Sequence, residues 1–179
     1  MQMRIRVLPL TVDVWPALED LFDTRGPCSR CWCMYWRIGA AYRKRPAKEN
    51  KADLFEIVKK GPPPGLIAFD GDLPVGWCQL TPHEAVPRIR RVDDLPVWSI
   101  SCFYVRIGYR RLGVTSALIT AAIKAAKRGN APALEAYPLD ARKTPSASGT
   151  GFVTTFLRAG FKVVCSDVPA RPIVRLNLR

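Results

Sequence analysis

Histidine and long apolar segments are scarce in this sequence of 179 residues. No uninterrupted apolar run approaches the roughly 20 residues that a membrane-spanning helix needs, so a membrane protein is not indicated. The first six residues are not followed by the apolar core of a signal peptide. We therefore expect a cytoplasmic protein whose six cysteines are reduced thiols.

Acidic residues are also few, 15 against 28 lysines and arginines, which gives a net charge of +13. Between Asp94 and Glu135 there is no acid, and a second acid-free basic stretch runs from Arg25 to Lys48. The basic residues of the first stretch are Arg106, Arg110, Arg111, Lys124, Lys127 and Arg128. Such a surplus predicts an anionic partner, which could be nucleic acid, an anionic membrane or an anionic cofactor.

The length fits one domain over residues 1–179, since domains usually have roughly 100–200 residues. A hydrophobic content of 48% is enough for a core. We find no internal repeat, linker or low-complexity segment.

The stretch 104–118 predicts an anion-binding turn. It joins a β-branched and aromatic run over 97–105 to a run with helical spacing of apolar residues over 114–128. Gly108 and Gly113 allow a sharp turn, and Arg110 and Arg111 add charge where a helix N-terminus offers unpaired N–H groups. A pyrophosphate suits this combination. The alternative is a plain turn with solvated arginines.

Here the sequence resembles the GNAT superfamily of acyl-CoA-dependent N-acyltransferases. Their signature, Arg/Gln-x-x-Gly-x-Gly/Ala after the fourth strand, is matched by 110–115, except that Thr115 replaces the last small residue. The resemblance continues through 134–138 and 156–161. It implies a mixed, mostly antiparallel central α/β sheet, splayed between strands four and five, with helices on both faces. The expected elements follow this order: 3–8, 12–22, 51–60, 66–69, 73–80, 97–105, 114–128, 133–137, 151–159, 161–165 and 172–178. Asn50 is expected to cap the helix over 51–60.

The resemblance implies acetyl-CoA as co-substrate and no metal. Pantetheine should contact the main chain of Phe103 and Val105 in the gap between the fourth and fifth strands. The pyrophosphate should be held by Arg110, Arg111, Leu112, Gly113, Val114 and Thr115. We expect direct transfer of the acetyl group to the amine of a small molecule or peptide.

Catalytic residues are less well marked, because two family features are missing. No carboxylate lies in 97–101, and Phe156 stands where many members have a catalytic tyrosine. Glu135 and Tyr137 are two apart on a strand and so share a sheet face, which makes them candidates for general base and acid. Alternatively, Glu135 pairs with an arginine and Tyr137 packs at a strand end. His83 follows the predicted hairpin and is a further candidate base, although we favour an exposed loop histidine. Cys102 could form an acyl-cysteine intermediate, but we favour a small buried thiol.

Three cysteines, Cys28, Cys31 and Cys33, lie within six positions, but no second Cys or His pair follows at zinc-finger spacing. We therefore favour an aromatic packing segment over a zinc site. The same segment is a candidate acceptor-binding wall, because the resemblance places it over that site. The residues of this wall are Trp32, Tyr35, Trp36 and Arg37.

Two other functions remain open. The missing family residues are compatible with a catalytically silent CoA-binding sensor or interaction domain. The charge is compatible with nucleic-acid binding, which we favour less because the basic residues gather around the phosphate turn. A homodimer is common among proteins of this resemblance and also remains open.

Overall fold

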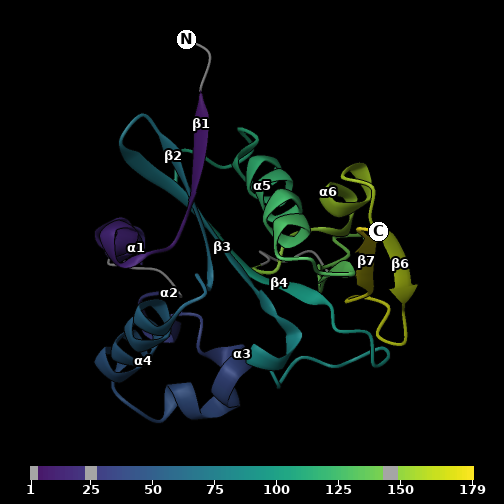
Figure 1. The fold of residues 1–179 in the computed structure, drawn as a ribbon, viewed down its shortest axis with the longest axis horizontal. Helices are drawn as coiled ribbons and strands as arrows, with labels where there is room; N and C mark the ends of the chain where they lie inside the picture. The colour runs from purple at the N-terminus through teal and green to yellow at the C-terminus, as the bar shows by residue number, and fades with distance from the viewer. Residues whose placement is uncertain (1–3, 23–27, 143–148) are drawn as a thin grey trace.

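Seven strands form one sheet in the order β1-β2-β3-β4-β5-β7-β6 (Figure 1). The computed structural model describes residues 4–22, 28–142 and 149–179. Neighbouring strands are antiparallel except β4 and β5, which run parallel. The strands are β1 (Ile5–Pro9), β2 (Gly65–Asp70), β3 (Leu73–Pro82), β4 (Trp98–Val105), β5 (Ala133–Ala136), β6 (Lys162–Cys165) and β7 (Ile173–Asn177).

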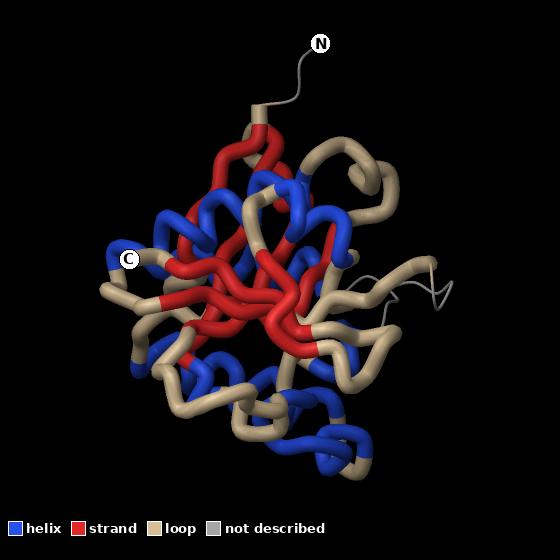
Figure 2. Tube along the Cα trace, turned by 90° about the vertical axis from the view of Figure 1, so that its right-hand side faces the viewer, coloured by secondary structure: helices blue, strands red, loops and turns tan. Residues whose placement is uncertain are grey.

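Helices lie on both sides of this sheet (Figure 2). The α-helices are α1 (Trp15–Phe22), α2 (Cys28–Cys31), α3 (Tyr35–Ile38), α4 (Ala47–Lys60), α5 (Val114–Arg128) and α6 (Val153–Arg158). Short 3-10 helices are η1 (Val12–Val14), η2 (Gly39–Arg43) and η3 (His83–Ala85). The predicted mixed, mostly antiparallel sheet with helices on both faces is confirmed. None of the helices among the described residues is long and apolar enough to cross a membrane.

The sheet separates two apolar cores. On one face, the buried stripe of α5 packs with α6 residues such as Phe156 against β3 and β4. On the other face, α1, α2 and α4 pack around Trp77, which is fully buried. Each large apolar side chain buried in this way contributes about 1.5–3 kcal/mol. The two cores fix β4, the strand that carries the candidate site, from both sides.

Most predicted elements match within a few residues, and α5 has the predicted bounds. Residue 3, where the first strand was predicted to begin, lies outside the described residues. The predicted start of a helix at position 51, with Asn50 as its cap, is wrong. α4 begins at Ala47, and Asn50 lies inside it with no exposed surface.

The Asn50 side chain links three segments instead of capping a helix. Its amide donates to the carbonyls of Arg30 (2.7 Å) and Tyr42 (3.0 Å), and its oxygen accepts from Arg45 Nε (2.7 Å). A local cap signal was overridden by these contacts between distant segments, which the sequence does not reveal.

Candidate active site

The turn between β4 and α5 leaves a helix N-terminus open. Gly113 precedes α5 with a φ of 85°, in the left-handed region that favours glycine. It has no side chain that could cap the N–H groups of the first turn. A Cβ atom added at Gly113 would meet no atom within 4 Å, so there is space around the turn. The predicted phosphate-binding residues therefore form a cradle of the right kind for an anion.

The side chains of this turn point to solvent. Arg110, Arg111 and Leu112 are exposed, whereas Val114 is buried beneath the helix. Neither arginine belongs to an ion pair among the described residues. Two cations without an ion pair among the described residues therefore lie next to the positive end of the α5 dipole, an arrangement that attracts an anion.

Along its second half β4 has an open edge, meaning an edge that pairs with no other strand among the described residues. β4 and β5 pair only between Trp98–Ile100 and Leu134–Ala136, and then part. Arg106 donates its N–H to Val75 of the β3 side (2.9 Å). Because main-chain groups alternate along an antiparallel strand, Phe103 and Val105 face the gap. There the Phe103 N–H donates to the carbonyl of Gly149 (2.6 Å), so one predicted pantetheine donor already has an internal partner.

A buried polar network lies where the two strands part. Tyr137 follows the last paired residue of β5, and its hydroxyl lies 2.8 Å from Ser99 Oγ. His83 Nδ1 lies 3.3 Å from both oxygens. His83 is only 3% exposed, so the expected exposed histidine is wrong. Its Nε2 is buried and has no hydrogen-bond partner among the described residues.

Glu135 joins this network to a chain of charges. The Tyr137 hydroxyl donates to Glu135 Oε2 (3.2 Å), and Arg175 holds Oε1 through Nη2 (2.6 Å) and Nε (2.8 Å). Arg175 also binds Asp93 at the surface (2.8 and 3.0 Å), and this contact lowers the pKa of Asp93. Glu135 is only 1% exposed and has almost no contact with solvent. Its carboxylate is paired with Arg175 instead.

The Tyr137 hydroxyl is held in its protonated form. Burial raises its pKa, and the nearby charge of Glu135 raises it further. A phenol of this kind stays protonated at neutral pH and donates a hydrogen bond. Tyr137 therefore offers an O–H donor at this point, and its hydroxyl links Glu135 to the cavity.

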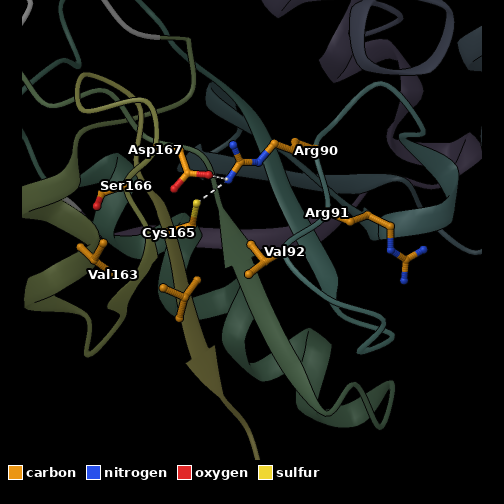
Figure 3. A pocket seen from close by; sticks show the side chains of 8 residues that line it. Arg90, Arg91, Val92, Val163, Cys165, Ser166 and Asp167 are labelled. Atoms are coloured by element: carbon orange, nitrogen blue, oxygen red, sulfur yellow. Dashed lines mark hydrogen bonds and ion pairs between the residues drawn. The ribbon is translucent and has the colours of Figure 1, made fainter.

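Tyr137 also lines a cavity of about 230 Å³. The other lining residues are Trp36, Arg88, Ile89, Arg90, Cys165, Val168, Arg171 and Ile173. They come from α3, from the loop before β4, from the facing ends of β6 and β7, and from the connection between these two strands. A shallower pocket of about 550 Å³ continues from it and shares Arg90 and Cys165. Figure 3 shows Arg90 directed across this outer pocket to Asp167 and Cys165, with Arg91 extending away from them.

The predicted acceptor wall is divided by the structure. Trp36 lines the cavity, and its Nε1 donates to the carbonyl of Ser101 (3.0 Å) beside the parting strands. Trp32 is 3% exposed and stacks on Trp15 in the core. Tyr35 is exposed and contacts Trp36 edge to face. Arg37 donates to the carbonyl of Ala85 (2.9 Å) and so supports the segment that carries His83.

The cysteine segment belongs largely to the core. Cys28 and Cys33 are buried, and Cys33 Sγ accepts from Trp77 Nε1 (3.1 Å). A hydrogen bond with Cys28 and burial raise the pKa of Cys102, which keeps it a thiol. No group of three or more His, Cys, Asp or Glu in the described part of the chain could hold a metal ion.

Several site residues gave no signal in the sequence. Ser99, Arg175 and Asp93 lie on three different segments and meet only through the register of β4, β5 and β7. The parallel pairing of β4 and β5 places Ser99 beside Glu135. Knowledge of this strand register would have identified Ser99 as a candidate site residue. The cavity arginines lie in loops, whose courses no periodic pattern fixes.

Comparison with known proteins agrees with this arrangement. The model of the acetyltransferase (GNAT) family matches residues 18–144. No curated protein sequence matches the chain significantly.

Solved structures resemble the whole chain. They include a PaiA N-acetyltransferase from Thermoplasma acidophilum in complex with coenzyme A, with 15% identity, a TM-score of 0.57 and a match covering 98% of this chain and 99% of that chain. An N-acetyltransferase from Staphylococcus aureus has 13% identity and a TM-score of 0.61, with 98% and 99% covered. The GNAT domain of S. lividans PAT has 20% identity and a TM-score of 0.59, with 99% and 95% covered. At these identities the similarity establishes the fold.

Proposed function

Because the chain belongs to the acetyltransferase (GNAT) family, we propose that it transfers an acetyl group from acetyl-CoA to the amine of a small molecule or peptide by direct attack. One observation carries this proposal. The open edge of β4 ends where Tyr137 lines the cavity. A donor lying along β4 and an acceptor in the cavity would therefore meet at this point.

The residues present fit the proposed donor. The first turn of α5, with Arg110 and Arg111 beside it, would hold the pyrophosphate through N–H groups and charge. Phe103 and Val105 would offer main-chain groups to the pantetheine. For Phe103 this requires the bond to Gly149 to open first. Acetyl-CoA would supply the acyl group as a thioester.

Tyr137 is the proposed proton donor. Its high pKa keeps the hydroxyl protonated, and its position at the cavity lets it reach a leaving group there. Glu135 orients this hydroxyl from Oε2 and so acts as a positioning residue rather than as a base in direct contact with the amine. This role replaces the direct general-base role that the sequence suggested.

His83 completes the proposed proton path. Its Nδ1 lies within hydrogen-bond distance of Ser99 Oγ and Tyr137 OH, so a proton can pass among the three groups. Removal of a proton from an ammonium acceptor needs a group that can accept it, and an imidazole can do so. His83 Nε2 has no hydrogen-bond partner among the described residues and is therefore the proposed acceptor atom.

The proposal is tested by thermal-shift titration with acetyl-CoA, followed by measurement of thiol release with a panel of amines. At 100 times the dissociation constant, binding should stabilise the fold by about 2.7 kcal/mol, which is about 5–10 °C for a chain of this size. The double variant Arg110→Ala/Gly113→Glu should lose this shift. Arg128→Ala, at the other end of α5, should keep it. No shift for the wild-type protein at saturating acetyl-CoA would overturn the proposal.

A CoA-binding domain without transferase activity is the second candidate. It is favoured by Phe156, a buried apolar residue at the position of the usual tyrosine. A normal thermal shift with acetyl-CoA, without thiol release for any amine in the panel, would select this candidate over the transferase.

A further inference from the structure

The cavity at Tyr137 carries positive charge that nothing in its lining compensates. Three of its lining residues are arginines, Arg88, Arg90 and Arg171, and none is acidic. A hollow lined by one sign of charge concentrates its field and attracts the opposite charge.

The partners of these arginines differ. Arg90 is paired with Asp167 (2.9 Å) in the outer pocket (Figure 3). Arg171 donates to Thr150 Oγ1 (3.3 Å), which carries no charge. The Arg88 side chain packs on Gly39, and its Nε lies 3.4 Å from the position that a Cβ atom on Gly39 would take. Neither Arg88 nor Arg171 takes part in an ion pair among the described residues.

The rest of the lining is apolar. Trp36, Ile89, Val168 and Ile173 surround the space between the arginines and Tyr137. A volume of about 230 Å³ lies below the usual range for drug-sized ligands, roughly 300–1,000 Å³. A single small molecule with one apolar group therefore fits the inner cavity better than a folded protein surface does.

We propose that the acceptor is a small amine that also carries an anionic group, a carboxylate or a phosphate, together with an apolar substituent. This inference rests on the proposed acetyl transfer. Arg88 and Arg171 bind the anionic group, because guanidinium groups pair with carboxylate and phosphate oxygens through two N–H donors. The apolar substituent packs on Trp36 and Ile173, and the amine lies near Tyr137.

The test compares matched acceptors at saturating acetyl-CoA. Phenylalanine is compared with phenylalaninamide, and 2-aminoethyl phosphate with ethanolamine, so that each pair differs in the anionic group. We expect kcat/KM to be at least about tenfold higher for the anionic member of one pair. The pair with the larger ratio identifies carboxylate or phosphate as the anion.

Variants then assign the effect to the cavity. In Arg88→Met/Arg171→Met the ratio should fall to near one, while the thermal shift with acetyl-CoA stays unchanged. Arg91→Met, which removes a neighbouring charge that extends away from Arg90 (Figure 3), should keep the ratio. Equal use of anionic and neutral acceptors by the wild-type protein would overturn the inference and leave acetyl transfer standing.

A binding measurement keeps the inference testable if no acceptor reacts. Two pairs of acetylated products are compared, N-acetylphenylalanine with N-acetylphenylalaninamide, and N-acetyl-2-aminoethyl phosphate with N-acetylethanolamine. In at least one pair the anionic member should raise the melting temperature in the presence of CoA, and the neutral member should not. Equal stabilisation, or none, within both pairs overturns the anion site. Absence of turnover with acetyl-CoA bound counts against the proposed function alone.

Discussion

Where β4 and β5 part, several polar side chains are buried and hydrogen-bonded to one another. Tyr137, Ser99 and His83 share one set of hydrogen bonds, and Glu135 is held by Arg175. Buried polar groups are costly unless they are paired. Because this network lies at a cavity, we propose that its polar groups serve the chemistry of the site as well as the fold.

Replacement of Tyr137 by Phe should remove the proton donor and leave the ring in place. We expect kcat for acetyl transfer to fall by about 10²-fold or more, the usual effect of losing a general acid, with little change in acetyl-CoA affinity. Tyr42→Phe, which removes a surface hydroxyl bonded to Arg43, should keep wild-type kcat. Steady-state thiol release measures both, and a Tyr137→Phe enzyme of normal kcat would contradict the assignment.

Asn50→Ala should destabilise the fold without touching the site. The variant leaves the carbonyls of Arg30 and Tyr42 without their partner in a buried place. Each unsatisfied buried group costs about 1–3 kcal/mol, so we expect the free energy of unfolding to fall by at least about 2 kcal/mol. Urea denaturation measures it, with Asn177→Ala on the exposed end of β7 as the control. A loss below about 0.5 kcal/mol would mean that water replaces the amide.

At the scale of elements, the contact between β3 and α5 sets the position of the proposed phosphate cradle. A Cβ at Gly76 of β3 would lie 2.5 Å from Val114 Cγ1 and 3.2 Å from Leu118 Cδ1. The absence of a side chain at Gly76 therefore lets the first turn of α5 pack directly on the sheet. The sequence predicted both β3 and α5, but it did not show that Gly76 is the point where the two elements pack closely.

Gly76→Ala should consequently affect stability and ligand binding together. Overpacking of this kind costs about 1–3 kcal/mol, and the displaced first turn of α5 should bind acetyl-CoA more weakly. Gly71→Ala, in the β2–β3 turn with a φ of 59° and no neighbour within 4 Å, should cost about 1–2 kcal/mol but leave acetyl-CoA affinity unchanged. Urea denaturation and titration calorimetry separate the two effects, and equal affinities in the two variants would contradict the role of this contact.

Over the whole molecule, buried thiols make stability depend on alkaline pH. Burial raises the pKa of Cys31 from 9.0 to about 11. Between pH 9 and pH 11 the folded protein therefore keeps the proton of the Cys31 thiol, whereas the unfolded chain releases it. The contribution of this proton to stability is present in full below pH 9 and is lost as the pH rises through 11.

We therefore expect the free energy of unfolding to fall by roughly 2–3 kcal/mol between pH 9 and 11 through Cys31. Urea denaturation of the wild-type protein and of Cys31→Ala across this range measures the contribution, and the variant should show the shallower decline. Parallel pH profiles for the two proteins would contradict it.

The sequence by itself determined the order of the main strands and of the long helices, and the basic, glycine-containing turn before α5. Both depend on local features, namely the spacing of apolar residues in α5 and the basic, glycine-containing segment before it. Short-range patterns record such features directly. The bounds of α5 and the family follow from this level of information.

Only the tertiary structure decided which side chains meet. His83, expected at the surface, is buried against Ser99 and Tyr137, and Trp32, expected at the acceptor site, lies in the core. Arg88 and Arg171 reach one cavity from loops about 80 residues apart in the chain. These contacts depend on strand register and on the course of loops, which are fixed by packing between distant segments and leave no periodic trace in the sequence.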